Sequence, residues 1–104
     1  MALVLGRKIN EVIFAETNGA SIKITLLSHR HNGTDKLALI KVEYDNLDAD
    51  EHELKVGGEL ATICSAPEIK IGLHEATRHG VRLSCHADKE VVFLRQEVKE
   101  RNNG

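Results

Sequence analysis

Short runs in which apolar and polar residues alternate constrain this chain more than any other feature of its sequence. In residues 21–27 (SIKITLL), Ile22, Ile24 and Leu26 occupy every second position, which places them on one face of an extended strand. Other short runs rich in Val, Ile and Leu predict strands at 2–5, 11–15, 37–42, 59–64, 68–73, 81–85 and 90–94. The 104-residue chain is therefore expected to be mainly β and to form a single domain.

Turn residues separate the expected strands. Asn32-Gly33 is a strong hairpin signal because both residue types tolerate positive φ, and His79-Gly80 predicts a second turn. From Arg95 onwards most residues are good helix formers (RQEVKER), and the run Asn102-Asn103-Gly104 is typical of a helix end. The sequence thus predicts a short C-terminal α-helix after the last strand.

The composition predicts an aliphatic core and an uneven distribution of charge. Aromatic residues make up only 3% of the chain, so it lacks the stacking platform of many RNA-binding modules. The formal net charge is −2, but residues 43–53 hold six acids and no lysine or arginine. We expect this acidic segment to be a solvated loop with a helical turn near residues 49–54. Without these residues the charge of the chain is positive, so a basic face elsewhere on the protein is possible.

Several functional classes find no support in the sequence. Cys64 and Cys85 form no CxxC motif, and the N-terminus is too short for a signal peptide, so the simplest expectation is a soluble cytoplasmic protein. The pairs His29/His31 and Cys85/His86 lack further ligands at a recognisable spacing, so no metal or cofactor is expected. The carboxylates of the acidic segment have no apolar pocket signal beside them, which argues against an enzyme.

The sequence also carries a weak internal echo. The residues Glu11, Ile22-Lys23-Ile24 and His31-Asn32-Gly33 recur as Glu59, Ile69-Lys70-Ile71 and Arg78-His79-Gly80, at an offset of 47 or 48 residues. Two interpretations stay open. Either similar β-meanders produce the echo by chance, or residues 1–45 and 54–104 are degenerate copies of one module joined by the acidic segment.

The two ends of the chain carry a more specific pattern. The opening, Leu3-Val4-Leu5-Gly6-Arg7-Lys8-Ile9-Asn10-Glu11, combines a short apolar strand, two basic residues and a Glu before the next strand. Near the other end, Val81-Arg82-Leu83 leads through Ala87-Asp88-Lys89-Glu90-Val91 to a β-prone run that ends at Arg95. Together these stretches, less than a third of the chain, resemble the two ends of the CsrA/RsmA family of RNA-binding translational regulators.

The resemblance implies both a fold and a site. The fold would consist of antiparallel strands with a C-terminal helix, as an intertwined homodimer or, in this longer chain, a single-chain pseudo-dimer. The first and last strands would lie side by side and read a GGA triplet in an RNA hairpin loop. Carried over residue by residue, the RNA site comprises Leu5, Arg7, Lys8, Ala87, Val91, Phe93, Leu94 and Arg95. Arg95 would contact a guanine, while Arg7 and Lys8 would hold phosphates.

Three positions depart from the family pattern. Gly6, Asp88 and Leu94 stand where the family has a hydroxyl-bearing residue, a proline and a histidine, and they bear on RNA affinity more than on the fold. The expected function is a non-enzymatic post-transcriptional regulator that binds GGA-containing mRNA leaders or small RNAs, with no membrane or DNA partner. The alternative is a protein-interaction module of the same fold that has lost RNA binding and acts through a partner protein or a mixed dimer.

Overall fold

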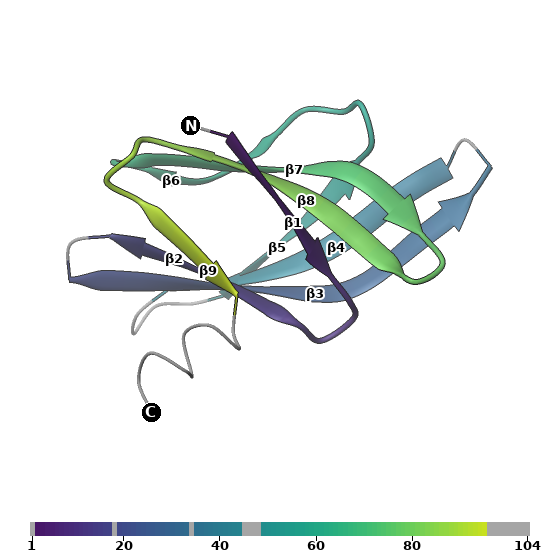
Figure 1. Ribbon diagram of the computed structural model, residues 1–104, viewed down its shortest axis with the longest axis horizontal. Helices are drawn as coiled ribbons and strands as arrows, with labels where there is room; N and C mark the ends of the chain where they lie inside the picture. Colours follow the sequence, from purple (N-terminus) through teal and green to yellow (C-terminus); the bar gives the residue numbers. More distant parts are fainter. Residues whose placement is uncertain (1, 18, 34, 45–48, 96–104) are drawn as a thin grey trace.

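The structure is a computed structural model that describes residues 2–17, 19–33, 35–44 and 49–95 (Figure 1). All regular secondary structure in these residues is β, which confirms the prediction of a mainly β protein. The expected C-terminal helix falls on residues 96–104, outside the described part of the chain. The strands are β1 Ala2–Arg7, β2 Val12–Thr17, β3 Ala20–Asn32, β4 Asp35–Glu43, β5 Ala49–Lys55, β6 Ala61–Ser65, β7 Glu68–Thr77, β8 Gly80–Ala87 and β9 Val92–Arg95.

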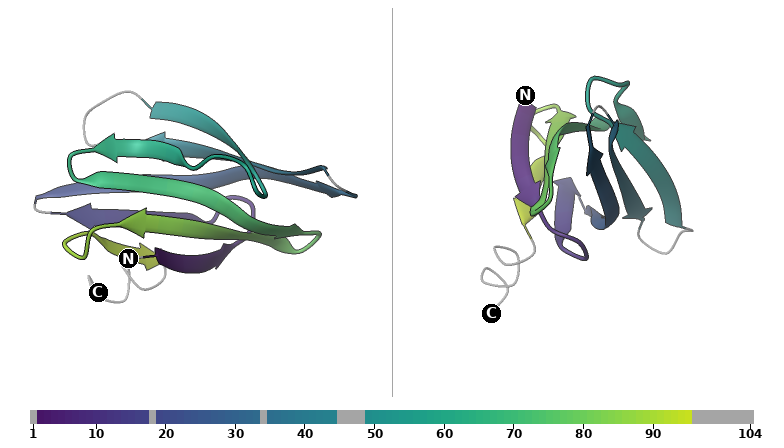
Figure 2. Two further views of the ribbon diagram at one scale, coloured as in Figure 1. Left: turned by 90° about the horizontal axis from the view of Figure 1, so that it is seen from above. Right: turned by 90° about the vertical axis from the view of Figure 1, so that its right-hand side faces the viewer.

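The strands form two antiparallel sheets that pack face to face (Figures 1 and 2). One sheet has the order β1-β8-β7-β6 and the other the order β5-β4-β3-β2-β9. The core between them is aliphatic, as the composition predicts, and the alternating Ile22, Ile24 and Leu26 of β3 all point into it. Apolar residues at every second position therefore give each sheet one buried face.

The strands of the first and second halves of the chain are interleaved. The meanders β2-β3-β4 and β6-β7-β8 each supply three neighbouring strands of one sheet. The first strand, β1, pairs with β8, whereas β5 and β9 from the second half pair with β4 and β2. Neither half therefore forms its sheet without the other.

The turn predictions are confirmed, but two strands are longer than the alternation indicates. Gly33 adopts a φ of 57° in the β3–β4 hairpin, and Thr77 faces Gly80 across the β7–β8 turn. Strand β3 continues to Asn32 and β7 to Thr77, past a β-bulge in each strand. A bulge adds one residue and shifts the side-chain alternation, so the simple period-two pattern ends before the strand does.

The prediction of a solvated loop with a helical turn is wrong for residues 49–54 of the acidic segment, whereas residues 45–48 lie outside the described part of the chain. Residues 49–55 form β5, an edge strand that pairs with β4 along its whole length. Leu54 is buried and anchors the strand to the core, while Asp50, Glu51 and Glu53 remain exposed. Charges on an edge strand are compatible with pairing on its inner side and discourage further strands on its outer side, so a high acid content did not exclude a strand here.

The two end strands do not pair with each other through backbone hydrogen bonds, since β1 pairs with β8 and β9 pairs with β2. Strand β1 is the edge of one sheet and β9 the edge of the other. Both edges lie on the same side of the sandwich, as the two views of Figure 2 show. The first and last strands thus face a common side of the molecule without sharing a ladder of hydrogen bonds.

Candidate functional site

An apolar pocket of about 270 Å³ lies where β1 meets the approach to β9. Leu3 contributes from β1, and Ala87, Val91 and Phe93 contribute from the second half of the chain. Val91 is almost fully buried, whereas Leu3 is 39% exposed and so reaches the surface. The pocket therefore brings the first strand together with three of the residues predicted for the RNA site.

Two charged residues lie at the rim of this pocket. Asp88 and Lys89 occupy the connection between β8 and β9, and both are exposed. The backbone N–H of Val91 donates a hydrogen bond to the carbonyl of Asp88 at 3.0 Å, which holds this connection in a tight turn. The rim thus carries one charge of each sign beside an apolar floor.

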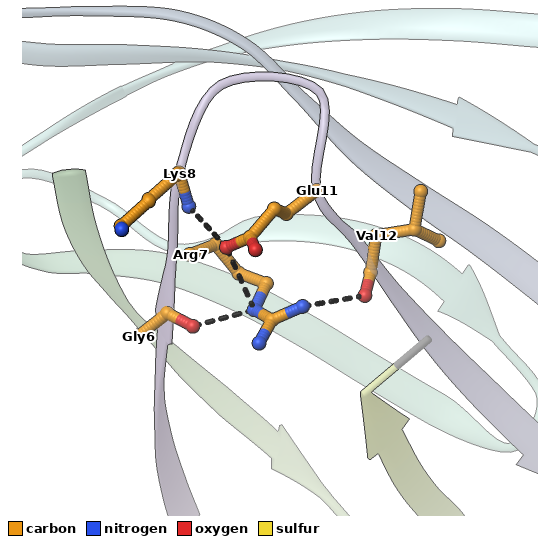
Figure 3. A network of polar contacts seen from close by, with 5 residues as sticks. All are labelled: Gly6, Arg7, Lys8, Glu11 and Val12. Carbon is orange, nitrogen blue, oxygen red and sulfur yellow. Dashed lines mark hydrogen bonds and ion pairs between the residues drawn. The ribbon is translucent and has the colours of Figure 1, made fainter. Parts of the chain in front are cut away.

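Arg7 has a structural position that the sequence did not indicate. Its side chain is buried, with 6% of the residue exposed, and its Nη1 donates to the carbonyl of Val12 at 3.2 Å (Figure 3). Its Nε donates to the carbonyl of Gly6 and lies 3.9 Å from Oε1 of Glu11 (Figure 3). The guanidinium is thereby committed to the β1–β2 connection, so the expectation that Arg7 presents its charge to a phosphate is not supported by its geometry.

Lys8 differs from Arg7 in this respect. Its side chain is exposed, and only its backbone N–H takes part in the loop, by donating to Oε1 of Glu11 at 2.8 Å (Figure 3). The same Glu11 carboxylate therefore contacts both the Arg7 guanidinium and the Lys8 backbone. Of the two predicted basic residues in the first strand region, Lys8 is the one whose charge faces solvent.

Arg95 lies close to the part of β2 whose backbone carbonyl Arg7 contacts. It ends β9, is exposed, and stands opposite Ile13 of β2. Ile13 directly follows Val12, whose carbonyl accepts the bond from Arg7. The two arginines predicted from opposite ends of the sequence thus approach one short stretch of β2 from different sheets.

The remaining predicted residues serve mainly as packing groups. Leu5 is 8% exposed and belongs to the core, and Phe93 packs against that core. Leu94 stands opposite Phe14 in the β2–β9 pair, and the pocket is lined by its neighbours Val92 and Phe93 and not by Leu94 itself. For Leu5, any contact with a ligand would have to come from the backbone at the edge of β1.

A second hollow, of about 420 Å³, lies at the other end of β1. Its lining includes Gly6 and Lys8, together with Glu75, His79 and Arg82 from β7, β8 and the turn between them. The sequence reasoning missed Arg82 and His79 as site candidates, and it also missed Leu3, Lys89 and Val92 at the first pocket. The alternation of β8 places Arg82 on the outer face, but only the pairing of β1 with β8 puts it beside Gly6.

The buried Cys85 and the partly buried Tyr44 are both held in their neutral forms. Burial raises the pKa of the Cys85 thiol to about 12. Burial also raises the pKa of Tyr44, with smaller contributions from the charge of Asp50 and from Cys64. The Tyr44 hydroxyl donates to the carbonyl of Ile63 at 2.6 Å, which ties the end of β4 to β6. Neither group is a nucleophile at neutral pH, because both remain protonated there.

Further observations on the described residues concern metals and membranes. Within residues 2–17, 19–33, 35–44 and 49–95, no group of three or more His, Cys, Asp and Glu side chains is placed to hold a metal ion. In the same part of the chain, no helix has the length and apolar character needed to cross a membrane.

Comparison with known proteins returns no relative. No family model matches the chain, and neither does any curated protein or any solved structure.

Proposed function

We propose that this protein is a non-enzymatic, RNA-binding post-transcriptional regulator that binds GGA-containing hairpins in mRNA leaders or small RNAs and acts in the cytoplasm. One observation carries the proposal. Among the described residues, β1 and β9 are sheet edges on the same side of the sandwich and meet around the apolar pocket, which supports the RNA site that the resemblance to the CsrA/RsmA family implies.

The chemistry of this side of the molecule suits single-stranded RNA. Edge strands have unpaired backbone N–H and C=O groups, which can pair with the donors and acceptors of base edges. The apolar pocket floor accepts the face of an unstacked base. Arg95 at the end of β9 provides the planar guanidinium that matches two acceptors of a guanine, while Lys8 and Lys89 are exposed and can contact phosphates.

The test is binding to a hairpin with a GGA loop, compared with the same hairpin in which the loop triplet is replaced. Affinity should fall steeply with salt, because each phosphate contact releases counterions, with a slope of about −0.7 per phosphate on single-stranded RNA. Arg95→Ala should abolish the preference for GGA.

Arg30→Ala is the matched control for this experiment. Arg30 is also exposed, but it lies near the end of β3 that leads into the β3–β4 turn. This turn and β9 lie in different parts of the molecule (Figure 1). The Arg30→Ala variant loses the same charge as Arg95→Ala, and it should bind the GGA hairpin almost as tightly as the unchanged protein. Equal affinities for the two loops, or equal losses in both variants, would contradict the proposal.

A second function is favoured by a specific observation. The Arg7 guanidinium is engaged inside the fold, and Asp88 places a negative charge at the pocket rim, so the site is less basic than the resemblance implies. Both features suit a protein-interaction module that has lost RNA binding. Absence of any hairpin binding at low salt would favour this alternative.

A further inference from the structure

The fold contains the same four-strand unit twice. The first unit is β1–β4 and the second is β5–β8. In each unit the last three strands form a meander, and the first strand pairs with the last strand of the other unit. The third strand of each unit has a β-bulge, after Leu26 in β3 and after Leu73 in β7. These two positions are 47 residues apart, which is also the offset of every echoed residue in the sequence except Glu11 and Glu59.

The strand registers establish the equivalence of the two first strands residue by residue. Leu26 pairs with Ile40, which pairs with His52 of β5. Leu73 pairs with Leu83, which pairs with Leu5 of β1. Strand β5 is therefore the structural counterpart of β1, again at an offset of 47. The equivalent pairs are Leu3 and Asp50, Val4 and Glu51, Leu5 and His52, and Gly6 and Glu53.

The hollows on the surface follow the same repeat. The 420 Å³ hollow beside the β7 bulge has a counterpart of about 230 Å³ beside the β3 bulge. In the smaller hollow, Glu53 takes the place of Gly6, and Leu39 takes the place of Arg82. The repeat therefore extends from the backbone to the surface, but the side chains at its two copies differ in size and charge.

These differences make the two first-strand edges chemically opposite. The β1 edge presents Leu3, Val4 and Gly6 and has no charge before Arg7. The β5 edge presents the exposed carboxylates of Asp50, Glu51 and Glu53. RNA phosphates close to these acids would be repelled, most strongly at low salt.

The two edges also differ in the strand that completes them. Strand β9 extends the five-stranded sheet beside β2, and the residues that lead into β9 form one wall of the apolar pocket beside β1. Among the described residues, no strand pairs with the matching free edge of β6. There the Tyr44 side chain bonds to the Ile63 carbonyl. The β5 side thus lacks both the neutral edge and the pocket wall.

We infer that the protein is a monomer with one RNA site, at the β1 and β9 edges, and that the equivalent β5 edge does not bind RNA. This inference rests on the proposed function. No second chain is needed to supply a first strand, because each unit receives the other unit's first strand within the chain. A protein of this kind occupies one hairpin at a time and cannot bridge two hairpins of one transcript.

The experiment is native mass spectrometry of the full chain alone and with a GGA hairpin in excess. The expected species are the 11.5 kDa monomer and a complex of one chain with one hairpin. A complex of two chains, or of one chain with two hairpins, would overturn the inference and leave the proposed function standing. Absence of any complex at low salt would instead overturn the proposed function, and the inference with it.

Reciprocal substitutions at equivalent positions test which edge binds. Leu3→Asp copies the β5 residue onto β1 and should weaken hairpin binding by at least about tenfold, because it places a charge beside the bound phosphates. Asp50→Leu is the matched exchange and should leave the affinity within about twofold and the 1:1 complex unchanged. Val4→Glu and Glu51→Val repeat the exchange at positions that are both exposed, in case Leu3→Asp disturbs folding. Loss of binding in the β5 variants rather than in the β1 variants would refute the assignment.

Discussion

At the scale of single residues, the buried thiol of Cys85 predicts how stability depends on pH. Its pKa is raised to about 12 in the folded state, whereas in the unfolded chain it ionises near pH 9. The unfolded state therefore loses a proton first, so the free energy of unfolding should fall as pH rises from 9 towards 12, by about 1.4 kcal/mol per pH unit for this group. Urea denaturation under reducing conditions at pH 8, 9 and 10 measures this slope. Cys85→Ala should reduce the slope and Cys64→Ala should not; identical slopes in all three proteins would exclude this cause.

Arg7 gives a second prediction at the same scale. Arg7→Ala removes the side-chain hydrogen bonds to the carbonyls of Gly6 and Val12 and empties a buried position, so the free energy of unfolding should fall by about 2–3 kcal/mol. Lys8→Ala removes an exposed charge and should change it by less than about 0.5 kcal/mol. Denaturation midpoints of the two variants make the comparison. Equal, small effects would mean that the Arg7 guanidinium does not hold the β1–β2 connection.

A close backbone approach gives a third prediction. A Cβ at Gly80 would lie 2.6 Å from the carbonyl oxygen of Arg7, and Gly80 has a φ of 156°. Gly80→Ala should therefore destabilise the fold by about 1–3 kcal/mol, because backbone must move to relieve the contact. Gly6→Ala is the stability control, since its nearest new contact is 3.9 Å. The prediction fails if thermal unfolding shows similar midpoints for both variants.

At the scale of elements, the assignment of residues 49–55 to an edge strand has a direct test. Leu54→Ala should cost about 2–5 kcal/mol, because its side chain is fully buried against the core. Glu53→Ala, one residue earlier and on the outer face, should change stability by less than about 0.5 kcal/mol. A strand predicts this sharp alternation, whereas a solvated loop predicts small effects at both positions. Chemical denaturation of the two variants distinguishes them.

At the scale of the whole molecule, the interleaved strands predict a single cooperative unfolding transition. Strand β1 depends on β8, and β5 depends on β4, so neither residues 1–45 nor residues 54–104 can keep a complete sheet alone. Tyr44 is the only tyrosine and there is no Trp, so its fluorescence reports the contact between the end of β4 and β6. The fluorescence and circular dichroism transitions in urea should coincide. Two separated transitions would mean that the halves fold independently.

The sequence by itself determined the class of structure and the positions of most strands. Alternation is a local property, so Ile22, Ile24 and Leu26 indicate a strand with one buried face whatever its neighbours are. Asn32-Gly33 and His79-Gly80 likewise mark their turns through local backbone preferences. Local signals gave the wrong structure for β5, because this strand carries many charges. Its pairing with β4 and the burial of Leu54 stabilise a strand despite this composition.

Only the tertiary structure decided which strands are neighbours and what the site residues contact. Alternation does not specify a partner, since any strand with one apolar face can pair with several others. Pairing of β1 with β8 and of β9 with β2 placed the two end strands in different sheets, with their edges on one side. The same pairing buried Arg7 against Val12 and left Arg95 exposed, although both are arginines near a strand end. Burial of a charged side chain depends on the carbonyls that surround it, and residues distant in sequence determine that surrounding.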